Sequence, residues 1–249
     1  MNPTPSSPGP AGCLTLLPGL GCDEELFAGL LPALRAAGHV CHVGTAHTRH
    51  DTMAAMATEI ADTLQGATGP HRLVGCSMGA MLALMAAAQA PDAVAGLVLI
   101  GTSARPDPPD IVRLREWAAG EFEAGRIDPV LAPNVALALH EDSARDPVLV
   151  GRYLTMVRRA GGASLARQNR AVAARADLRP LLPRITAPTL VLCGDADQIT
   201  PLEHAREIAH LLPDAELQLV PGTGHLPTLE QPARVLERLL PWLAAQRVF

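Results

Sequence analysis

The chain has 249 residues, of which 48% are hydrophobic and 18% are charged, and its net charge is −5. This apolar content can form one domain, or one domain with a small insertion, and it excludes a disordered chain. All 20 basic residues are arginine, which excludes lysine-dependent chemistry such as Schiff-base catalysis or a Walker phosphate loop. The scattered acidic excess and the scarcity of aromatic residues argue against nucleic acid or an anionic membrane as a partner.

The first residues, 1–12, are rich in Pro, Ser and Gly and lack the apolar region of a signal peptide, so we predict a flexible leader. The longest apolar run, Met78–Ala88, is too short to span a membrane. The number of cysteines is odd, and no Cys-x-x-Cys motif occurs among Cys13, Cys22, Cys41, Cys76 and Cys193. We therefore expect neither a disulfide framework nor a cysteine-based zinc site, and we predict a cytoplasmic protein in a reducing compartment.

Short apolar runs alternate with helical patterns, which predicts strand–helix units and a mostly parallel central sheet flanked by helices. The runs expected to form strands are Cys13–Leu17, His39–Val43, Leu73–Cys76, Val94–Ile100, Thr189–Cys193 and Glu216–Val220. The expected helices are Leu26–Ala37, Thr52–Gln65, Met78–Ala90, Pro201–Leu211 and Glu230–Ala245. Asp51 or Thr52 can cap the second of these helices.

The alternation stops between the fourth and fifth expected strands. Residues 102–186 contain no strand-like run, carry many arginines and are bracketed by proline clusters. We interpret 102–186 as a helical lid inserted before the last two strands, over the carboxyl edge of the sheet. Residues 13–101 and 187–249 then form the core.

A Gly-x-Ser-x-Gly motif follows the third expected strand and precedes a helix, in the segment Gly75-Cys76-Ser77-Met78-Gly79. This is the context of a nucleophile elbow, in which a tight turn exposes the serine at the carboxyl end of a central strand. The flanking positions must be small, and Gly75 and Gly79 satisfy this requirement. The amide of Met78 opens the next helix and can point at a developing oxyanion. The alternative is a serine in an ordinary strand–helix turn.

Two further motifs each follow a later strand. Gly222-Thr223-Gly224-His225-Leu226 offers a histidine on a flexible loop that can reach a serine hydroxyl. Cys193-Gly194-Asp195-Ala196-Asp197 offers a carboxylate that can orient the imidazole, although an Asx-type turn that caps the helix near Pro201 is an alternative. The chain order Ser, Asp, His, with each residue at a strand end, is much less expected by chance than any single motif.

With these motifs the sequence resembles the serine α/β-hydrolases, over roughly residues 13–243. It is most similar to small bacterial members that open with Leu16-Leu17-Pro18-Gly19-Leu20 and contain a G-H-x-x-x-x-E-x-P phrase, completed here by Glu230 and Pro232. The resemblance implies that the acid is Asp197, the base is His225 and the nucleophile is Ser77. It also implies an oxyanion hole formed by the amides of Leu20 and Met78. Pro18-Gly19 replaces the commoner His-Gly, so substrate preference does not transfer.

Other clusters have simpler interpretations. Four histidines lie close together (His39, His42, His47 and His50), but alternation along a strand places His39 and His42 on opposite faces, so no metal site is expected. Cys22 and Cys76 are interpreted as packing residues, because the serine already has a base. The arginines of residues 102–186 are expected to cover solvated helix faces, with Arg170 and Arg175 as candidates for binding an anionic group.

The sequence thus predicts a serine hydrolase without metal or organic cofactor, cleaving carboxylic esters of small to medium apolar acyl groups. Its expected partner is a small-molecule ester. Three alternatives remain open: hydrolysis of thioesters or acyl-carrier esters, hydrolysis of a carbon–carbon bond, and a ligand-binding module without turnover. The fold alone does not decide between them.

Overall fold

The computed structural model describes residues 12–69 and 71–246. Residues 1–11 of the predicted leader lie outside this part of the chain. Six strands form one sheet: β1 (Cys13–Leu17), β2 (Val40–Val43), β3 (His71–Cys76), β4 (Val94–Ile100), β5 (Thr189–Gly194) and β6 (Ala215–Val220). Their order is β2-β1-β3-β4-β5-β6, and every neighbouring pair is parallel, so the carboxyl ends of all six strands share one edge.

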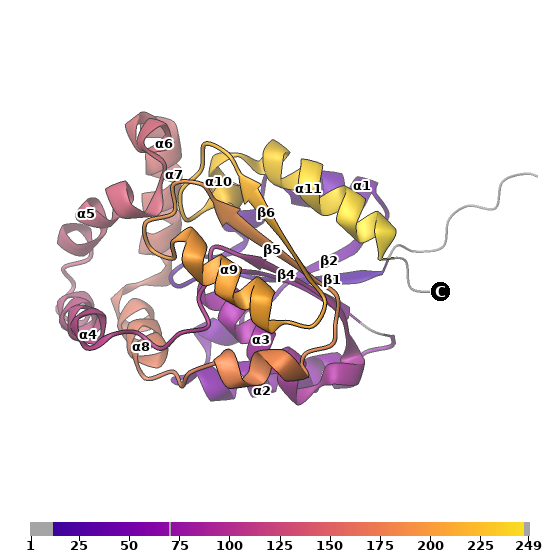
Figure 1. The fold of residues 1–249 in the computed structure, drawn as a ribbon. Helices are drawn as coiled ribbons and strands as arrows, with labels where there is room; N and C mark the ends of the chain where they lie inside the picture. Colours follow the sequence, from indigo (N-terminus) through magenta and orange to yellow (C-terminus); the bar gives the residue numbers. More distant parts are fainter. Residues whose placement is uncertain (1–11, 70, 247–249) are drawn as a thin grey trace, which may run out of the picture.

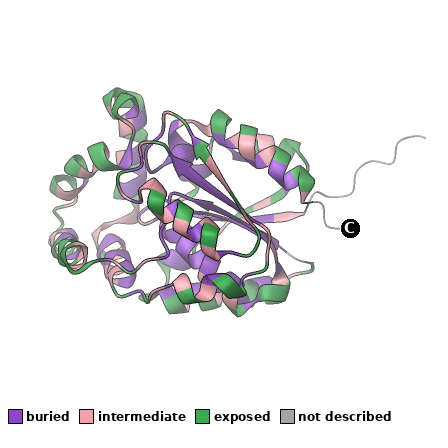
Figure 2. Cartoon of the chain, viewed as in Figure 1, coloured by how far each residue is buried: buried purple, intermediate pink, exposed green. Residues whose placement is uncertain are grey.

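Helices cover both faces of this sheet (Figure 1). On one face lie α1 (Leu31–Ala36) and α11 (Pro232–Ala245), and on the other lie α2 (Met53–Gln65), α3 (Met78–Gln89) and α9 (Leu202–Leu211). The side chains of β4 alternate between two cores, with Val98 and Ile100 in one and Leu97 and Leu99 in the other. Burial on both faces explains why the central strands are continuous apolar runs. Figure 2 shows the buried sheet between the exposed outer surfaces of the helices.

All six predicted strands are present, but two predicted helices are interrupted. The first contains a short 3₁₀ helix, Glu24–Phe27, and α1 starts only at Leu31. The last one also breaks, because α10 (Pro227–Glu230) ends before a non-helical Gln231 with φ −136°. Pro32 and Pro232 each lie in the first turn of the helix that follows the break, where a missing amide hydrogen costs nothing. Continuous helices through these positions were therefore the wrong prediction.

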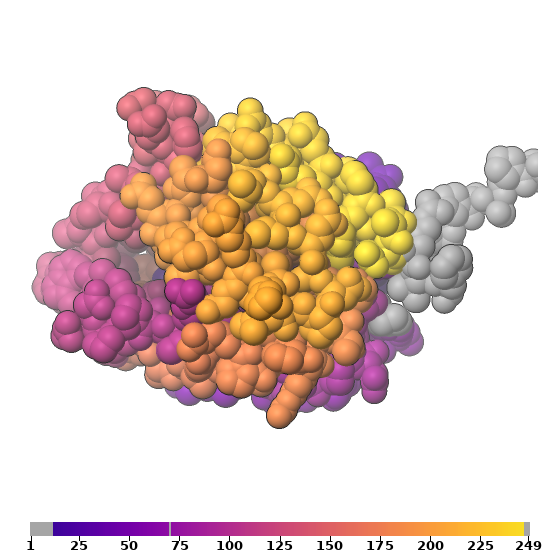
Figure 3. Space-filling view, viewed as in Figure 1, coloured from indigo at the N-terminus to yellow at the C-terminus, as the bar shows by residue number. Residues whose placement is uncertain are grey.

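The chain between β4 and β5 is helical, and we call residues 102–186 the helical insertion. It contains α4 (Pro109–Glu123), α5 (Asp128–Ala138), α6 (Glu141–Arg145), α7 (Pro147–Ala160) and α8 (Gly162–Ala173), then a 3₁₀ helix at Arg179–Arg184. In Figure 1 its helices gather at one end of the sheet, and Figure 3 shows a hollow in the surface between α4 and the chain that follows β5. The functional role of this insertion as a lid stays a prediction.

The two ends of the insertion are tied together by a buried ion pair. Arg175 is 7% exposed and donates to Asp107 at 2.8 Å and to the carbonyl of Arg105 at 2.6 Å. Arg170, in contrast, binds Glu116 and Glu123 on an exposed surface. Arg175 is therefore a structural link between the start and the end of the insertion.

Within residues 12–69 and 71–246, no helix is both long enough and apolar enough to cross a membrane. The cytoplasmic location stays a prediction.

Candidate active site

Ser77 occupies a strained turn between β3 and α3. Its φ is 55° and its ψ is −120°, and it is the only non-glycine residue with positive φ among the residues described. Its amide donates to the carbonyl of Ile100 at the end of β4, at 2.8 Å. Such strain persists where the surroundings fix the backbone, and it holds the serine side chain at the carboxyl edge of the sheet.

The glycines on either side of Ser77 permit this turn. A Cβ atom at Gly75 would lie 2.4 Å from the Cα of Ala80, and one at Gly79 would lie 1.9 Å from the carbonyl oxygen of Leu17. No side chain fits at these distances. The small residues of the motif are therefore required by the close approach of α3 to β1 and β3.

Ser77, His225 and Asp197 are brought together by hydrogen bonds, although they come from loops after three different strands. Nε2 of His225 lies 2.8 Å from Oγ of Ser77, and Nδ1 lies 2.9 Å from Oδ2 of Asp197. His225 and Asp197 are 4% and 6% exposed, so this network is shielded from water. The arrangement can remove a proton from the Ser77 hydroxyl and stabilise the imidazolium that results.

Several donors keep Asp197 ionised. Burial alone would raise its pKa, but the charge and the hydrogen bond of His225, together with hydrogen bonds from Thr200, outweigh burial and lower the pKa. Oδ1 also accepts from the amides of Ile199 and Thr200, both at 2.9 Å. The Asx turn and the contact with His225 thus occur at the same aspartate, although the sequence presented them as alternatives. α9 follows Pro201 and has no side-chain cap.

The second candidate carboxylate, Asp195, has different hydrogen-bond partners. Asp195 is exposed and accepts from the amides of Gly222 and Thr223, at 2.8 and 3.3 Å. It therefore braces the loop that leads to His225 and is not the residue that binds the imidazole.

The two predicted oxyanion donors, Leu20 and Met78, belong to segments next to Ser77. Met78 is the first residue of α3, directly after Ser77. Leu20 belongs to the loop after β1, which passes close to the nucleophile, because a Cβ atom at Gly19 would lie 3.3 Å from Cβ of Ser77. The amide of Cys22 donates to the carbonyl of Gly19 at 3.0 Å and closes a turn with Leu20 and Gly21 at its centre. We call residues 18–23 the oxyanion loop.

Three further residues fix the site and had no role in the sequence interpretation. Oγ1 of Thr200 donates to Asp197 at 2.8 Å, and Oγ1 of Thr102 donates to the carbonyl of Ser77 at 3.0 Å. Glu230 accepts from the amides on both sides of His225, Gly224 at 2.9 Å and Leu226 at 3.3 Å. Only Glu230 had a signal in the sequence, because it belongs to the phrase that contains His225.

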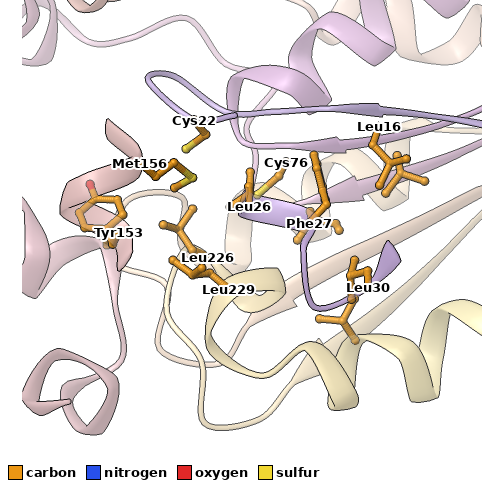
Figure 4. Close-up of a cluster of buried hydrophobic side chains, with 14 of the residues drawn as sticks. Leu16, Cys22, Leu26, Phe27, Leu30, Cys76, Tyr153, Met156, Leu226 and Leu229 are labelled. Carbon is orange, nitrogen blue, oxygen red and sulfur yellow. The ribbon is translucent and has the colours of Figure 1, made fainter. Parts of the chain in front are cut away.

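The two cysteines beside the site are buried in an apolar cluster with Leu26, Met156 and Leu226 (Figure 4). Burial, with a smaller contribution from Asp23, raises the pKa of the Cys22 thiol to about 12. Burial also raises the pKa of Cys76. Since a reactive cysteine needs a lowered pKa, both are packing residues, as the sequence interpretation proposed.

The histidine cluster is divided among separate contacts. His47 is buried and its Nε2 lies 3.0 Å from the carbonyl oxygen of Cys22, whereas His50 binds Glu59 at 2.6 Å. In the part of the chain that the structure describes, no group of three His, Cys, Asp or Glu side chains is placed to hold a metal.

The sequence and the structure were compared with those of known proteins. A family model for the α/β hydrolase fold matches residues 14–232. The chain belongs to the α/β-hydrolase family. This confirms the predicted fold class, including its parallel sheet flanked by helices.

Among relatives of this α/β hydrolase is the pimeloyl-[acyl-carrier protein] methyl ester esterase of Xanthomonas oryzae, 28% identical over 95% of this chain and 96% of that protein. The protein of the same name from Chromobacterium violaceum is 32% identical over 71% of each chain. A solved structure, a thermophilic esterase from Thermogutta terrifontis with malate bound, has a TM-score of 0.85 and 28% identity, covering 95% of this chain and 90% of that one.

Proposed function

We propose that this α/β hydrolase cleaves carboxylic esters through an acyl-enzyme on Ser77. The observation that carries the proposal is the continuous hydrogen-bonded chain from Ser77 through His225 to Asp197, on a strained turn at the sheet edge. The names of the relatives, which are esterases, support the same reaction.

In the first step, Nε2 of His225 accepts the proton of the Ser77 hydroxyl while Oγ attacks the acyl carbon of the ester. The π electrons of the carbonyl move to its oxygen, which becomes an oxyanion. Asp197 holds the proton of His225 on Nδ1 and stabilises the imidazolium. When the oxyanion collapses, the bond to the alcohol oxygen breaks, and His225 gives its proton to this leaving group.

The amides of Leu20 and Met78 are the proposed donors to the oxyanion. A preorganised donor of this kind is worth roughly 3 kcal/mol in the transition state. Water then attacks the acyl-enzyme, with His225 as its base, and the carboxylic acid leaves as Ser77 recovers its proton. Every group that these steps require is supplied by the chain itself.

We propose that the acyl group is apolar and of small to medium size. Buried Cys22, Tyr153, Met156 and Leu226 lie together where the helical insertion meets the core beside His225 (Figure 4). An apolar surrounding of this kind favours hydrocarbon chains over charged or sugar-bearing groups.

The test begins with the intact mass of the protein after incubation with a fluorophosphonate, beside the Ser77→Ala variant treated identically. We expect one adduct on the wild type and none on the variant. With p-nitrophenyl esters of increasing acyl length, Ser77→Ala should lose turnover by a factor on the order of 10⁶. Equal turnover in both proteins, or a preference for charged acyl groups, would contradict the proposal.

Acyl-carrier esters form a second candidate substrate class, favoured by the names of two relatives. Such substrates carry a phosphate, which arginines of the insertion could bind. Arg152 and Arg159 are instead engaged with Glu25 and Asp23, each at 2.8 Å, which supports a simple ester as first choice. Comparing kcat/KM for a free methyl ester and for the same acyl methyl ester on a carrier protein separates the two.

The remaining alternatives have different products. Hydrolysis of a β-diketone-like substrate would release a ketone with the acid, and a binding module would show ligand affinity without any product. Mass spectrometry of reaction mixtures distinguishes both from ester cleavage.

A further inference from the structure

The oxyanion loop lies directly against the helical insertion. Gly21 has a φ of +68°, and a Cβ atom there would lie 2.6 Å from Cδ2 of Leu165 and 3.1 Å from Cγ1 of Val157. Leu165 is on α8 and Val157 is on α7. The loop that contains Leu20 is thus in contact with side chains from a part of the sequence that lies far beyond it.

One side chain of the insertion forms a hydrogen bond with this loop. Oε1 of Gln168 accepts from the amide of Gly21 at 2.8 Å, and its Nε2 donates to Oγ of Ser164 at 2.9 Å. Gln168 is 0% exposed, and its bond with Gly21 is buried. The Gly21 amide can only donate, so it is the oxygen end of the Gln168 side chain that must face it.

This contact determines the orientation of one peptide plane. Leu20 and Gly21 are the central residues of the turn closed by the Cys22 amide and the Gly19 carbonyl. The central peptide of such a turn has two accessible orientations that differ by a flip. Because Gln168 accepts from the N–H of that peptide, it stabilises one of them. A flip would change ψ of Leu20 and φ of Gly21, whereas the Leu20 amide belongs to the preceding peptide. The same bond also ties the oxyanion loop, which carries the Leu20 amide, to α8.

We propose that Gln168 is a positioning residue that holds the Leu20 amide toward the oxyanion. The inference rests on the proposed ester hydrolysis. The helical insertion, whose role as a lid is a prediction, then also completes the active site.

The matched control for Gln168 is a substitution of the next residue, Asn169. Asn169 is 6% exposed and belongs to the same helix, but its amide donates to the carbonyl of Leu165 at 2.9 Å and its oxygen lies 3.5 Å from Arg115. These contacts remain within the insertion. Gln168→Met and Asn169→Met each replace one buried amide by the same apolar side chain.

We expect Gln168→Met to lower kcat on p-nitrophenyl butyrate by about 10–100-fold, less than the roughly 10²–10³-fold for complete loss of an oxyanion donor. KM should change by less than about threefold, because binding of the ester in its ground state does not depend on the oxyanion hole. Asn169→Met should retain kcat within about threefold. Gln168→Glu keeps an acceptor for Gly21, and the Ser164 hydroxyl can rotate to donate, so this variant should recover most of kcat.

A second measurement separates positioning from general loss of structure. An alkyl trifluoromethyl ketone forms an oxyanion on the serine, whereas butyrate binds as a product. Ki for the ketone should rise in Gln168→Met by the factor by which kcat/KM falls, and Ki for butyrate should stay within about twofold. Hydrogen–deuterium exchange of a peptide covering 18–23 should be faster in Gln168→Met and unchanged in Asn169→Met.

Unchanged exchange in the oxyanion loop of Gln168→Met would overturn the proposal, whatever the activity. So would a kcat within threefold of the wild type while Ser77→Ala is inactive, or equal losses in Gln168→Met and Asn169→Met. If the wild type itself hydrolyses no ester, the proposed function fails, and the exchange data still decide whether Gln168 orders the loop.

Discussion

Replacing Asp197 by asparagine should abolish most activity through the tautomer of His225. Oδ1 of Asp197 accepts from two backbone amides, those of Ile199 and Thr200. The carbonyl oxygen of an asparagine must take this place, so its NH₂ group points at Nδ1 of His225. Two donors cannot face each other, and His225 must therefore lose the proton from Nδ1 and carry it on Nε2, toward Ser77.

A histidine with its proton on Nε2 cannot accept the proton of the serine. The analogous substitution in a serine protease lowers kcat by about 10⁴ without disturbing the geometry. We expect the same order of magnitude for Asp197→Asn, measured as kcat on p-nitrophenyl butyrate, with KM changed much less.

Asp195→Asn is the matched control, because the same substitution two residues away leaves an oxygen to accept from Gly222 and Thr223. Its kcat should remain within about threefold of the wild type. Thermal unfolding of both variants shows whether either has lost its fold. A folded Asp197→Asn protein with wild-type kcat, or a larger loss in Asp195→Asn, would refute the assignment of the acid.

Four further predictions concern stability. In Glu230, Oε1 accepts from Gly224 and Leu226, and Oε2 accepts from the amide of His140 at 2.7 Å. Glu230→Gln places an amide N–H against one of these backbone donors and should lower the free energy of unfolding by about 1–3 kcal/mol in urea titrations; an unchanged midpoint would contradict this. Burial alone would raise the pKa of Asp107, but Arg175 and Arg115 outweigh burial and lower the pKa below its ordinary value. The stability that Asp107 contributes is therefore present at neutral pH and is lost as the pH falls through the folded-state pKa. The loss in free energy of unfolding caused by Asp107→Asn should be largest at neutral pH and should shrink in acid. A loss that is independent of pH would refute this. Gly79→Ala should prevent folding, since its Cβ meets a carbonyl oxygen at 1.9 Å. Gly151→Ala, at an exposed position of α7 with open space around it, should stabilise by about 0.5–1 kcal/mol in thermal unfolding.

Periodicity predicted the strands well because each face of the sheet is buried against its own layer. Val98 and Ile100 face one core, and Leu97 and Leu99 face the other, so β4 had to be apolar throughout. Helix boundaries were less predictable. A proline such as Pro232 is tolerated in the first turn but not in the interior, so it restarts a helix within an otherwise continuous apolar pattern.

The catalytic candidates were predictable for a topological reason. In a parallel sheet, residues that follow strands meet at one edge, so Ser77, Asp197 and His225 could be proposed from their positions after strands. Contacts made by loops with the insertion were not predictable in this way. The bond between Gly21 and Gln168 joins residues 147 positions apart, and no local pattern marks either partner.

The contacts of the insertion also bear on how substrate reaches Ser77. Met156, Val157 and Leu165 are almost fully buried in the cluster shared with the core, and exposing them costs about 1.5–3 kcal/mol each. The surface pair of Arg159 with Asp23 adds at most about 1 kcal/mol. If the whole insertion moved away from the core, these apolar side chains would become exposed, and the bond between Gln168 and the oxyanion loop would also break. Substrate binding that leaves α7 and α8 in place breaks neither set of contacts, so we expect these two helices to stay in place when substrate binds.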